Sequence, residues 1–332
     1  MTIDRRSALL GGMAAAGLAV RAAAQTPPPS TSALPPARPQ PTETIDLWPK
    51  GAPGMPATPP VETVNERSTD PLINDRAVFG ITRPRMVVFR PAKPNGAAVL
   101  ITPGGGYSWV VVDKEGYELG AWLADRGITA FVLFYRLPHE GWAAGPDTPL
   151  SDAQRAMRLI RHRAPYYGID PDRVSAIGFS AGGHLCADLA ARFAAPTYAP
   201  VDAVDRLSAR PVVAAPIYPV ISMALPTAHE RSRANLIGTD ATLTLERAHS
   251  PHLNIAADTP PCFLVHAEDD NSVVVRNSLL LRDALKARSI PVESHIFTEG
   301  GHGFGLSRAK GKPAAIWPEL FLNWARYRGA II

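Results

Sequence analysis

The sequence predicts an α/β fold in which a mostly parallel sheet is covered by helices on both faces. Short β-rich apolar runs alternate with helical patterns through most of the chain, as expected when each parallel strand is followed by a crossover helix. The chain has 332 residues, of which 46% are hydrophobic and 19% charged, an ordinary composition for a globular protein. We therefore expect one α/β domain with a single large core.

Residues 1–24 are predicted to be an export signal. Arg5 and Arg6 precede a weakly apolar run that is shorter than the roughly 20 residues needed to span a bilayer. The paired arginines resemble a twin-arginine signal, and residues 22–24, all alanine, offer a cleavage site. We expect a periplasmic or secreted protein with no stable membrane insertion after signal removal. The alternative is a disordered or membrane-anchoring N-terminus that is not cleaved.

Residues 25–60 are predicted to form a linker or arm. The stretch is dense in Pro, Ala, Ser and Thr, which bury too little apolar area to offset the entropy of ordering. Its later part, residues 45–49, is apolar enough to attach to the domain as an edge strand or extended arm. The catalytic domain is then expected to cover residues 61–332.

The strands and helices of this domain are predicted from periodicity. Strands are expected at 86–90, 97–102, 128–135, 174–179, 212–218, 261–266 and 292–297. Helices are expected at 115–126, 150–167, 181–193, between the last two strands, and at 316–327. In the helix 150–167 apolar residues recur at spacings of three and four, which gives one buried stripe.

Composition argues against several other classes of protein. The formal charge of +4 falls to about +2 without residues 1–24, and no basic cluster alternates with stacking aromatics, so a nucleic-acid partner is not expected. The two cysteines, Cys186 and Cys262, lie in an apolar helix and an apolar strand, which favours buried free thiols over a disulfide, although a bridge stays open. No zinc pattern is present, and no metal site is expected.

The strongest chemical signal is the G-x-S-x-G sequence at residues 178–182. It falls between a predicted strand and a predicted helix, where a sharp, strained turn projects the hydroxyl of Ser180 above the sheet. The helix directs its free N–H groups and the positive end of its dipole at this position. We therefore predict that Ser180 is a nucleophile; the alternative is a purely structural turn.

A glycine run at residues 104–106 follows the strand 97–102. Glycines let backbone N–H groups approach a substrate without side-chain clashes, as an oxyanion hole requires. We predict that the N–H of Ala181, with that of Gly105 or Gly106, forms this hole. The alternative is a phosphate loop or a plain turn, but neither a Walker lysine nor a G-x-G-x-x-G pattern is present. Pro103 stands where the lipase-type motif begins with histidine.

The base and its orienting acid are expected on later loops. His302 lies between glycines after the strand 292–297, where it can take the serine proton and return it to the leaving alcohol. Three adjacent carboxylates follow the strand 261–266, of which Asp270 is the predicted acid and Asp269 the alternative. The order Ser180, Asp270, His302 is that of α/β-hydrolases.

From residue 48 to its end the chain resembles bacterial α/β-hydrolase esterases of the acetyl xylan esterase and feruloyl esterase-like group. The motifs that carry the resemblance lie at 103–107, 114–116, 135–138, 178–184, in the acid loop and at 301–303. The resemblance implies a central eight-stranded sheet and hydrolysis of short acyl esters on plant cell-wall carbohydrate. Some relatives are named xylanases, but no carboxylate pair for glycoside cleavage stands out.

The expected activity is that of a serine esterase that forms an acyl-enzyme and needs no metal or organic cofactor. Tyr107, Trp109 and Trp142 are candidates for contact with an ester or acylated oligosaccharide, and residues 223–258 for a lid. A serine exopeptidase uses the same triad, but usually carries an additional gating domain for which we see no room after the linker. The rival from another class is a catalytically silent hydrolase fold used for binding.

Overall fold

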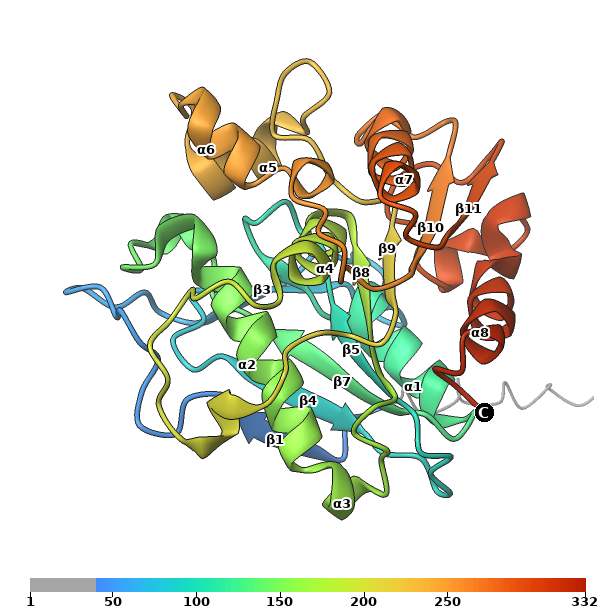
Figure 1. The fold of residues 1–332 in the computed structure, drawn as a ribbon, viewed down its shortest axis with the longest axis horizontal. Helices are drawn as coiled ribbons and strands as arrows, with labels where there is room; N and C mark the ends of the chain where they lie inside the picture. Colours follow the sequence, from blue (N-terminus) through green and yellow to red (C-terminus); the bar gives the residue numbers. More distant parts are fainter. Residues whose placement is uncertain (1–39) are drawn as a thin grey trace, which may run out of the picture. The chain divides into compact units, whose positions relative to one another are not determined.

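The computed structural model describes residues 40–332, so the predicted export signal and the first part of the linker lie outside the described residues. Its centre is an eight-stranded sheet in the order β1-β4-β7-β5-β8-β9-β10-β11 (Figure 1). The strands are β1 (Glu43–Asp46), β4 (Arg85–Phe89), β5 (Ala98–Thr102), β7 (Thr129–Phe134), β8 (Val174–Phe179), β9 (Ala214–Ile217), β10 (Cys262–Ala267) and β11 (Val292–Phe297). Every strand predicted from periodicity is present.

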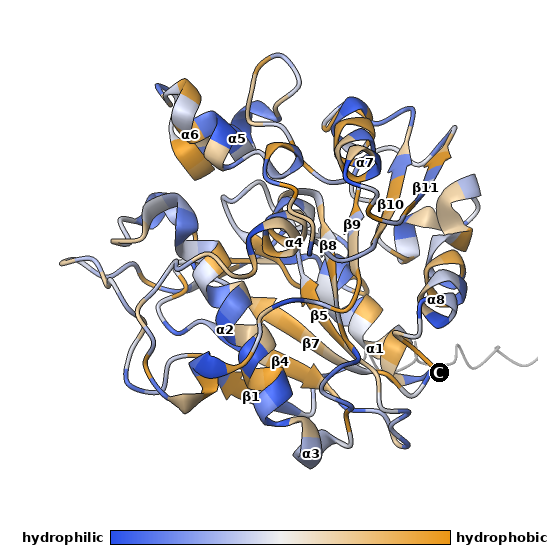
Figure 2. Cartoon of the chain, in the orientation of Figure 1, coloured by the Kyte–Doolittle hydropathy of each residue, from blue (hydrophilic) through white to orange (hydrophobic). Residues whose placement is uncertain are grey.

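Only the β1 edge of this sheet is antiparallel. The strand β4 pairs antiparallel with both β1 and β7, and every pairing from β7 to β11 is parallel. The central strands β5, β7 and β8 are buried along their whole length, which explains why their sequences read as continuous apolar runs (Figure 2). The eight-stranded, mostly parallel sheet with its helices confirms the α/β-hydrolase fold.

The predicted helices are present with two local differences, and two short helices between residues 223 and 258 were not predicted. The helices are α1 (Glu118–Ala124), α2 (Thr148–His162), α3 (Ala164–Tyr167), α4 (Ser180–Arg192), α5 (Glu230–Ile237), α6 (Leu243–Ala248), α7 (Arg276–Ala287) and α8 (Trp317–Tyr327). The predicted helix 115–126 starts as a π-helical turn, Asp113–Tyr117. The predicted helix 150–167 is divided at Arg163, because Pro165 has no N–H to continue the hydrogen bonds of α2. None of the helices in residues 40–332 is long and apolar enough to cross a membrane.

A second, three-stranded sheet was not predicted. It consists of β2 (Thr63–Glu66), β3 (Arg76–Phe79) and β6 (Val110–Val111). Every residue of β2 is exposed, so this strand carries no apolar alternation that a sequence pattern can reveal. This small sheet brings the segment around Arg67 next to the loop that follows β5.

The arm before the domain attaches through buried polar contacts. The strand β1 forms the sheet edge expected for residues 45–49. Next to it, the indole N–H of Trp48 donates to Asp152 Oδ1 at 2.7 Å. The same carboxylate accepts hydrogen bonds from the guanidinium of Arg136, and the side chains of Arg136 and Asp152 are 1% and 0% exposed. The arm is therefore held by a carboxylate that also neutralises a buried cation.

We expect Asp152→Asn to lower the free energy of unfolding by about 3 to 5 kcal/mol, because it leaves the buried Arg136 without a counter-charge. Urea unfolding followed by tryptophan fluorescence measures the change. Asp46→Asn is the matched control: it breaks an ion pair with Arg83 whose side chains are 38% and 77% exposed, and should cost less than about 1 kcal/mol. Equal losses in the two variants would contradict this assignment.

Candidate active site

Ser180 lies at the turn between β8 and α4, in the strained geometry predicted for it. Its φ of 54° is in the left-handed region, which residues with a side chain rarely occupy. A Cβ on Gly178 would lie 2.1 Å from the carbonyl oxygen of Gly182, and one on Gly182 would lie 2.1 Å from that of Thr102. Neither position can hold a residue with a side chain, because the end of β5 passes directly against this turn.

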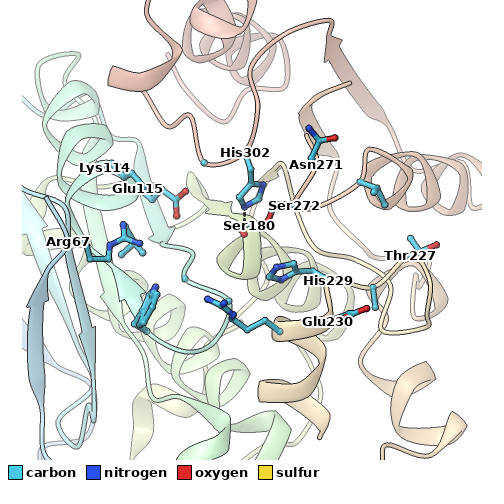
Figure 3. Close-up of a pocket in the computed structure, with 18 of the residues that line it drawn as sticks. Arg67, Lys114, Glu115, Ser180, Thr227, His229, Glu230, Asn271, Ser272 and His302 are labelled. Atoms are coloured by element: carbon cyan, nitrogen blue, oxygen red, sulfur yellow. Dashed lines mark hydrogen bonds between the residues drawn. The ribbon is translucent and has the colours of Figure 1, made fainter. Parts of the chain in front are cut away.

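The structure brings Ser180, His302 and Asp270 together. The hydroxyl of Ser180 donates to Nε2 of His302 at 2.9 Å (Figure 3). On the other side of the ring, Nδ1–H donates to Asp270 Oδ2 at 2.7 Å. Tyr218 packs edge-on against the imidazole, with ring centroids 5.2 Å apart. The imidazole is thus fixed in the tautomer whose Nε2 can accept the serine proton.

The carboxylate of Asp270 is held in its charged form. Oδ1 accepts the backbone N–H groups of Ser272 and Val273, each at 2.9 Å. Burial by itself raises the pKa of Asp270, but hydrogen bonds from His266 and His302 outweigh that effect and hold the pKa well below its usual range. His266, which is not among the predicted site residues, is buried beside Asp270 with its Nε2 3.3 Å from Oδ2.

The alternative acid, Asp269, has a different contact. Its Oδ1 accepts the backbone N–H groups of Gly300 and Gly301 at 2.9 and 2.7 Å. Gly301 has a φ of 68°, so the chain turns sharply just before His302. Adjacent carboxylates therefore hold the imidazole and the loop that carries it.

The glycine run passes over Ser180, as an oxyanion hole requires. A Cβ on Gly104 would lie 3.0 Å from that of Ser180. Within residues 40–332 the N–H groups of Gly105 and Gly106 have no hydrogen-bond partner, and both residues line the cavity above Ser180. Ala181 is in the first turn of α4, where helical N–H groups lack an i−4 acceptor. These donors are available to a developing oxyanion.

Tyr107 does not line the cavity, so the prediction that it contacts a substrate is wrong. It is 1% exposed and its hydroxyl donates to Nδ1 of His184 at 2.7 Å. Nε2–H of His184 in turn donates to the carbonyl of His249. Because His184 lies on α4 one turn after Ser180, this contact fastens the glycine run to the nucleophile helix. Tyr107 therefore has an anchoring role.

Trp142 also lies outside the cavity, and the prediction that it contacts substrate is wrong. It is 3% exposed, and its ring packs against the guanidinium of the buried Arg136, whose Cζ lies 4.7 Å from the ring centroid. Trp109 does line the cavity. The two buried cysteines are free thiols, as expected.

Glu115 is a site residue that was not predicted, although it lies in the motif at residues 114–116. This carboxylate is 3% exposed, and its Oε2 accepts the N–H of Gly104 at 2.9 Å. Oε1 accepts the hydroxyl of Tyr218 at 3.0 Å, and that hydroxyl accepts the N–H of Gly305. One carboxylate thus connects the glycine run to the Tyr218 ring that packs against His302 and, through the Tyr218 hydroxyl, to the loop that follows His302. Its place in the π-helical turn gives no sequence signal of this role.

A cavity of about 750 Å³ opens above Ser180 (Figure 3). The segment predicted to be a lid, residues 223–258, forms one wall through residues 226–231. The same segment contains α5, whose Asn235 donates through Nδ2 to the carbonyl of Gly106 and to Ser108 Oγ, at 2.8 and 2.7 Å. The insertion is therefore bonded to the glycine run as well as bordering the entrance.

Comparison with known proteins identifies related chains. A model of the BD-FAE family matches residues 86–285. An acetylxylan esterase from Xylanibacter ruminicola is 34% identical over 67% of this chain, and endo-1,4-beta-xylanase B from Butyrivibrio fibrisolvens is 35% identical over 68%. The chain spans 44% and 34% of the lengths of these two relatives.

One solved structure is similar to this chain over nearly the whole length of the solved protein. The acetyl ester-xyloside bifunctional hydrolase from Caldicellulosiruptor lactoaceticus is 34% identical, with a TM-score of 0.71 over 87% of this chain and 97% of that one. The likeness therefore extends over most of the length of both chains.

We expect Glu115→Gln to lower kcat for an aryl acetate by about 10- to 100-fold with less than about threefold change in KM, because the amide cannot accept both hydrogen bonds and the oxyanion donors shift. Steady-state kinetics separates the two parameters. Glu118→Gln, on α1 and hydrogen-bonded to Ser307 away from the triad, is the control and should behave as wild type. An unchanged kcat in Glu115→Gln would refute this positioning role.

His184 should make stability depend on pH. Burial lowers the pKa of His184 to about 4, so the unfolded chain, with an ordinary histidine pKa of about 6.5, binds the proton more readily. The contribution of His184 is complete above about pH 6.5 and is lost as the pH falls towards 4, by about 2 kcal/mol between pH 7 and pH 5. Urea unfolding at several pH values should show a flatter pH dependence in His184→Asn, while His139→Asn, at an exposed histidine, leaves the slope unchanged.

Proposed function

Because the chain belongs to the BD-FAE family, we propose that it is a serine carboxylic-ester hydrolase that removes acetyl or feruloyl groups from plant cell-wall carbohydrate. The observation that carries the proposal is the hydrogen-bonded series Ser180, His302, Asp270 beneath the glycine run. In this order the serine is the nucleophile, the histidine the general base and the aspartate the group that orients the histidine.

Acylation begins when Ser180 Oγ attacks the ester carbonyl and His302 Nε2 takes its proton. The carbonyl oxygen becomes an oxyanion, which accepts hydrogen bonds from the N–H groups of Ala181 and of Gly105 or Gly106. His302 then gives its proton to the leaving alcohol, and an acyl-enzyme remains. Asp270 stays ionised and stabilises the imidazolium.

Deacylation repeats these steps with water. His302 takes a proton from a water molecule, which attacks the acyl carbon and forms a second oxyanion in the same place. When this intermediate collapses, Ser180 recovers its proton and the carboxylic acid leaves. No metal or organic cofactor takes part.

The relatives support the choice of substrate. One is named an acetylxylan esterase and the similar solved structure an acetyl ester-xyloside hydrolase, which together favour acetylated xylan. Another is named a xylanase, but this chain spans only 34% of its length. Deacylation of a cell-wall polymer also fits an exported enzyme, and we propose that residues 1–24 are a twin-arginine export signal removed on the way to the periplasm or the medium.

We expect Ser180→Ala to lower kcat for an aryl acetate by roughly three to six orders of magnitude and to abolish labelling by a fluorophosphonate, because the nucleophile is lost. Ser272→Ala is the matched control. Ser272 lines the same cavity and its backbone contact to Asp270 does not need the hydroxyl, so activity should stay within about fivefold. Wild-type protein that is not labelled would instead identify a silent hydrolase fold.

The purified protein should also release acetate from acetylated xylan or ferulate from feruloyl esters. Dipeptide anilides test the alternative, a serine exopeptidase with the same triad. Cleavage of the anilides at a higher kcat/KM than the esters would replace the esterase proposal with the peptidase.

A further inference from the structure

We propose that the cavity wall formed by Arg67, Trp109 and Lys114 binds a carboxylate on the leaving alcohol, so that the preferred substrates are acyl esters of acidic sugars. The inference rests on the proposed esterase function and specifies, in addition, that the substrate is negatively charged. It starts from the side chains that line the cavity over Ser180, among which arginine and lysine face the same space as the nucleophile (Figure 3).

Lys114 is a partly buried cation without a direct partner. Its ammonium forms no hydrogen bond or ion pair within residues 40–332, although Glu115 and Asp75 are near enough to act on it electrostatically. Burial lowers the pKa of Lys114, which means that the charged form is incompletely solvated. Such an ammonium is stabilised by an anion that enters the cavity, because it has lost part of its water without gaining an ion pair in direct contact.

Arg67 adds further donors to this wall. Its Nε and Nη2 bond to Asp75, whereas Nη1 has no partner within the described part of the chain. The guanidinium lies over the indole of Trp109, with Cζ 5.9 Å from the ring centroid. A flat apolar surface next to unused N–H donors suits a pyranose ring that carries a carboxylate.

The carboxylates near this wall do not cancel its charge. Glu115 already accepts hydrogen bonds from Gly104 and Tyr218. Asp75 is shared between Arg67 and Arg308, and Glu230 lies across the cavity from Arg67 and Lys114 (Figure 3). An exposed arginine of the insertion, Arg231, adds a positive charge at the rim, with no ion pair among residues 40–332.

The position of Lys114 indicates which part of the substrate it meets. The leaving alcohol must lie next to His302 Nε2, because the imidazole returns a proton to its oxygen. A Cβ on Gly303, the residue after His302, would lie 3.5 Å from Nζ of Lys114. The cationic wall is therefore on the alcohol side of the ester, where the sugar is bound.

The test compares two aryl acetates that differ only in charge, 4-acetoxybenzoate and 4-acetoxybenzamide. The quantity measured is the ratio of their kcat/KM values, acid over amide, so that the amide reports ester hydrolysis itself in each variant. We expect Lys114→Met to lower this ratio about tenfold and Arg231→Gln to lower it by a smaller factor. About 0.5 M NaCl should lower the wild-type ratio, because salt screens partly exposed charges.

Arg126→Gln is the control: it removes a cation that pairs with Glu319 and does not line the cavity, so the ratio should stay at the wild-type value. Fluorophosphonate labelling of each variant verifies an intact site. A wild-type ratio that neither Lys114→Met nor Arg231→Gln changes would overturn the inference and leave the esterase function standing. Failure to hydrolyse either acetate would overturn both.

With acetylated xylo-oligosaccharides, wild-type protein should release acetate faster from those that carry a uronic acid than from neutral ones of equal length. Lys114→Met should reduce that difference. Faster release from the neutral oligosaccharides would count against an acidic substrate.

Discussion

The strained turn at Ser180 is the constraint on which the rest of the site depends. A side-chain-bearing residue with a φ of 54° is kept there only because its surroundings leave no alternative. The end of β5 fills the space beside Gly178 and Gly182, and the hydroxyl of Thr102 donates to the carbonyl of Gly182 at 2.8 Å. The nucleophile and the start of the oxyanion loop are therefore held by the same close contact.

Around this turn, three carboxylates take separate parts in holding the site. Asp270 orients the imidazole, Asp269 holds the backbone before it, and Glu115 joins the glycine run to Tyr218. Each accepts two or more hydrogen bonds, and for Asp270 and Glu115, which are buried, these bonds make a charge tolerable away from water. Their contacts join loops that are far apart in the sequence into one rigid group.

The parts of this arrangement that the sequence predicts are those with a local signal. The central strands β5, β7 and β8 are readable because they are buried along their whole length and their sequences are largely apolar. Ser180 is readable because G-x-S-x-G stands between a strand and a helix. The exposed strand β2 has no such signal. Whether an aromatic near a glycine run faces the cavity depends on packing: Trp109 faces it, whereas Tyr107 turns towards His184, a partner distant in the chain. Glu115 was missed as a site residue for the same reason.

The contact of Asn235 with the glycine run has a consequence for how such an enzyme can change. One amide group bonds both the carbonyl of Gly106 and the hydroxyl of Ser108, so α5 and the oxyanion donors share a mechanical link. A substitution that moves this helix to admit a bulkier sugar also tilts the groups that stabilise the transition state. Substrate selectivity and turnover are thus coupled through α5. A substitution in this helix that improves one of them requires a compensating change to preserve the other.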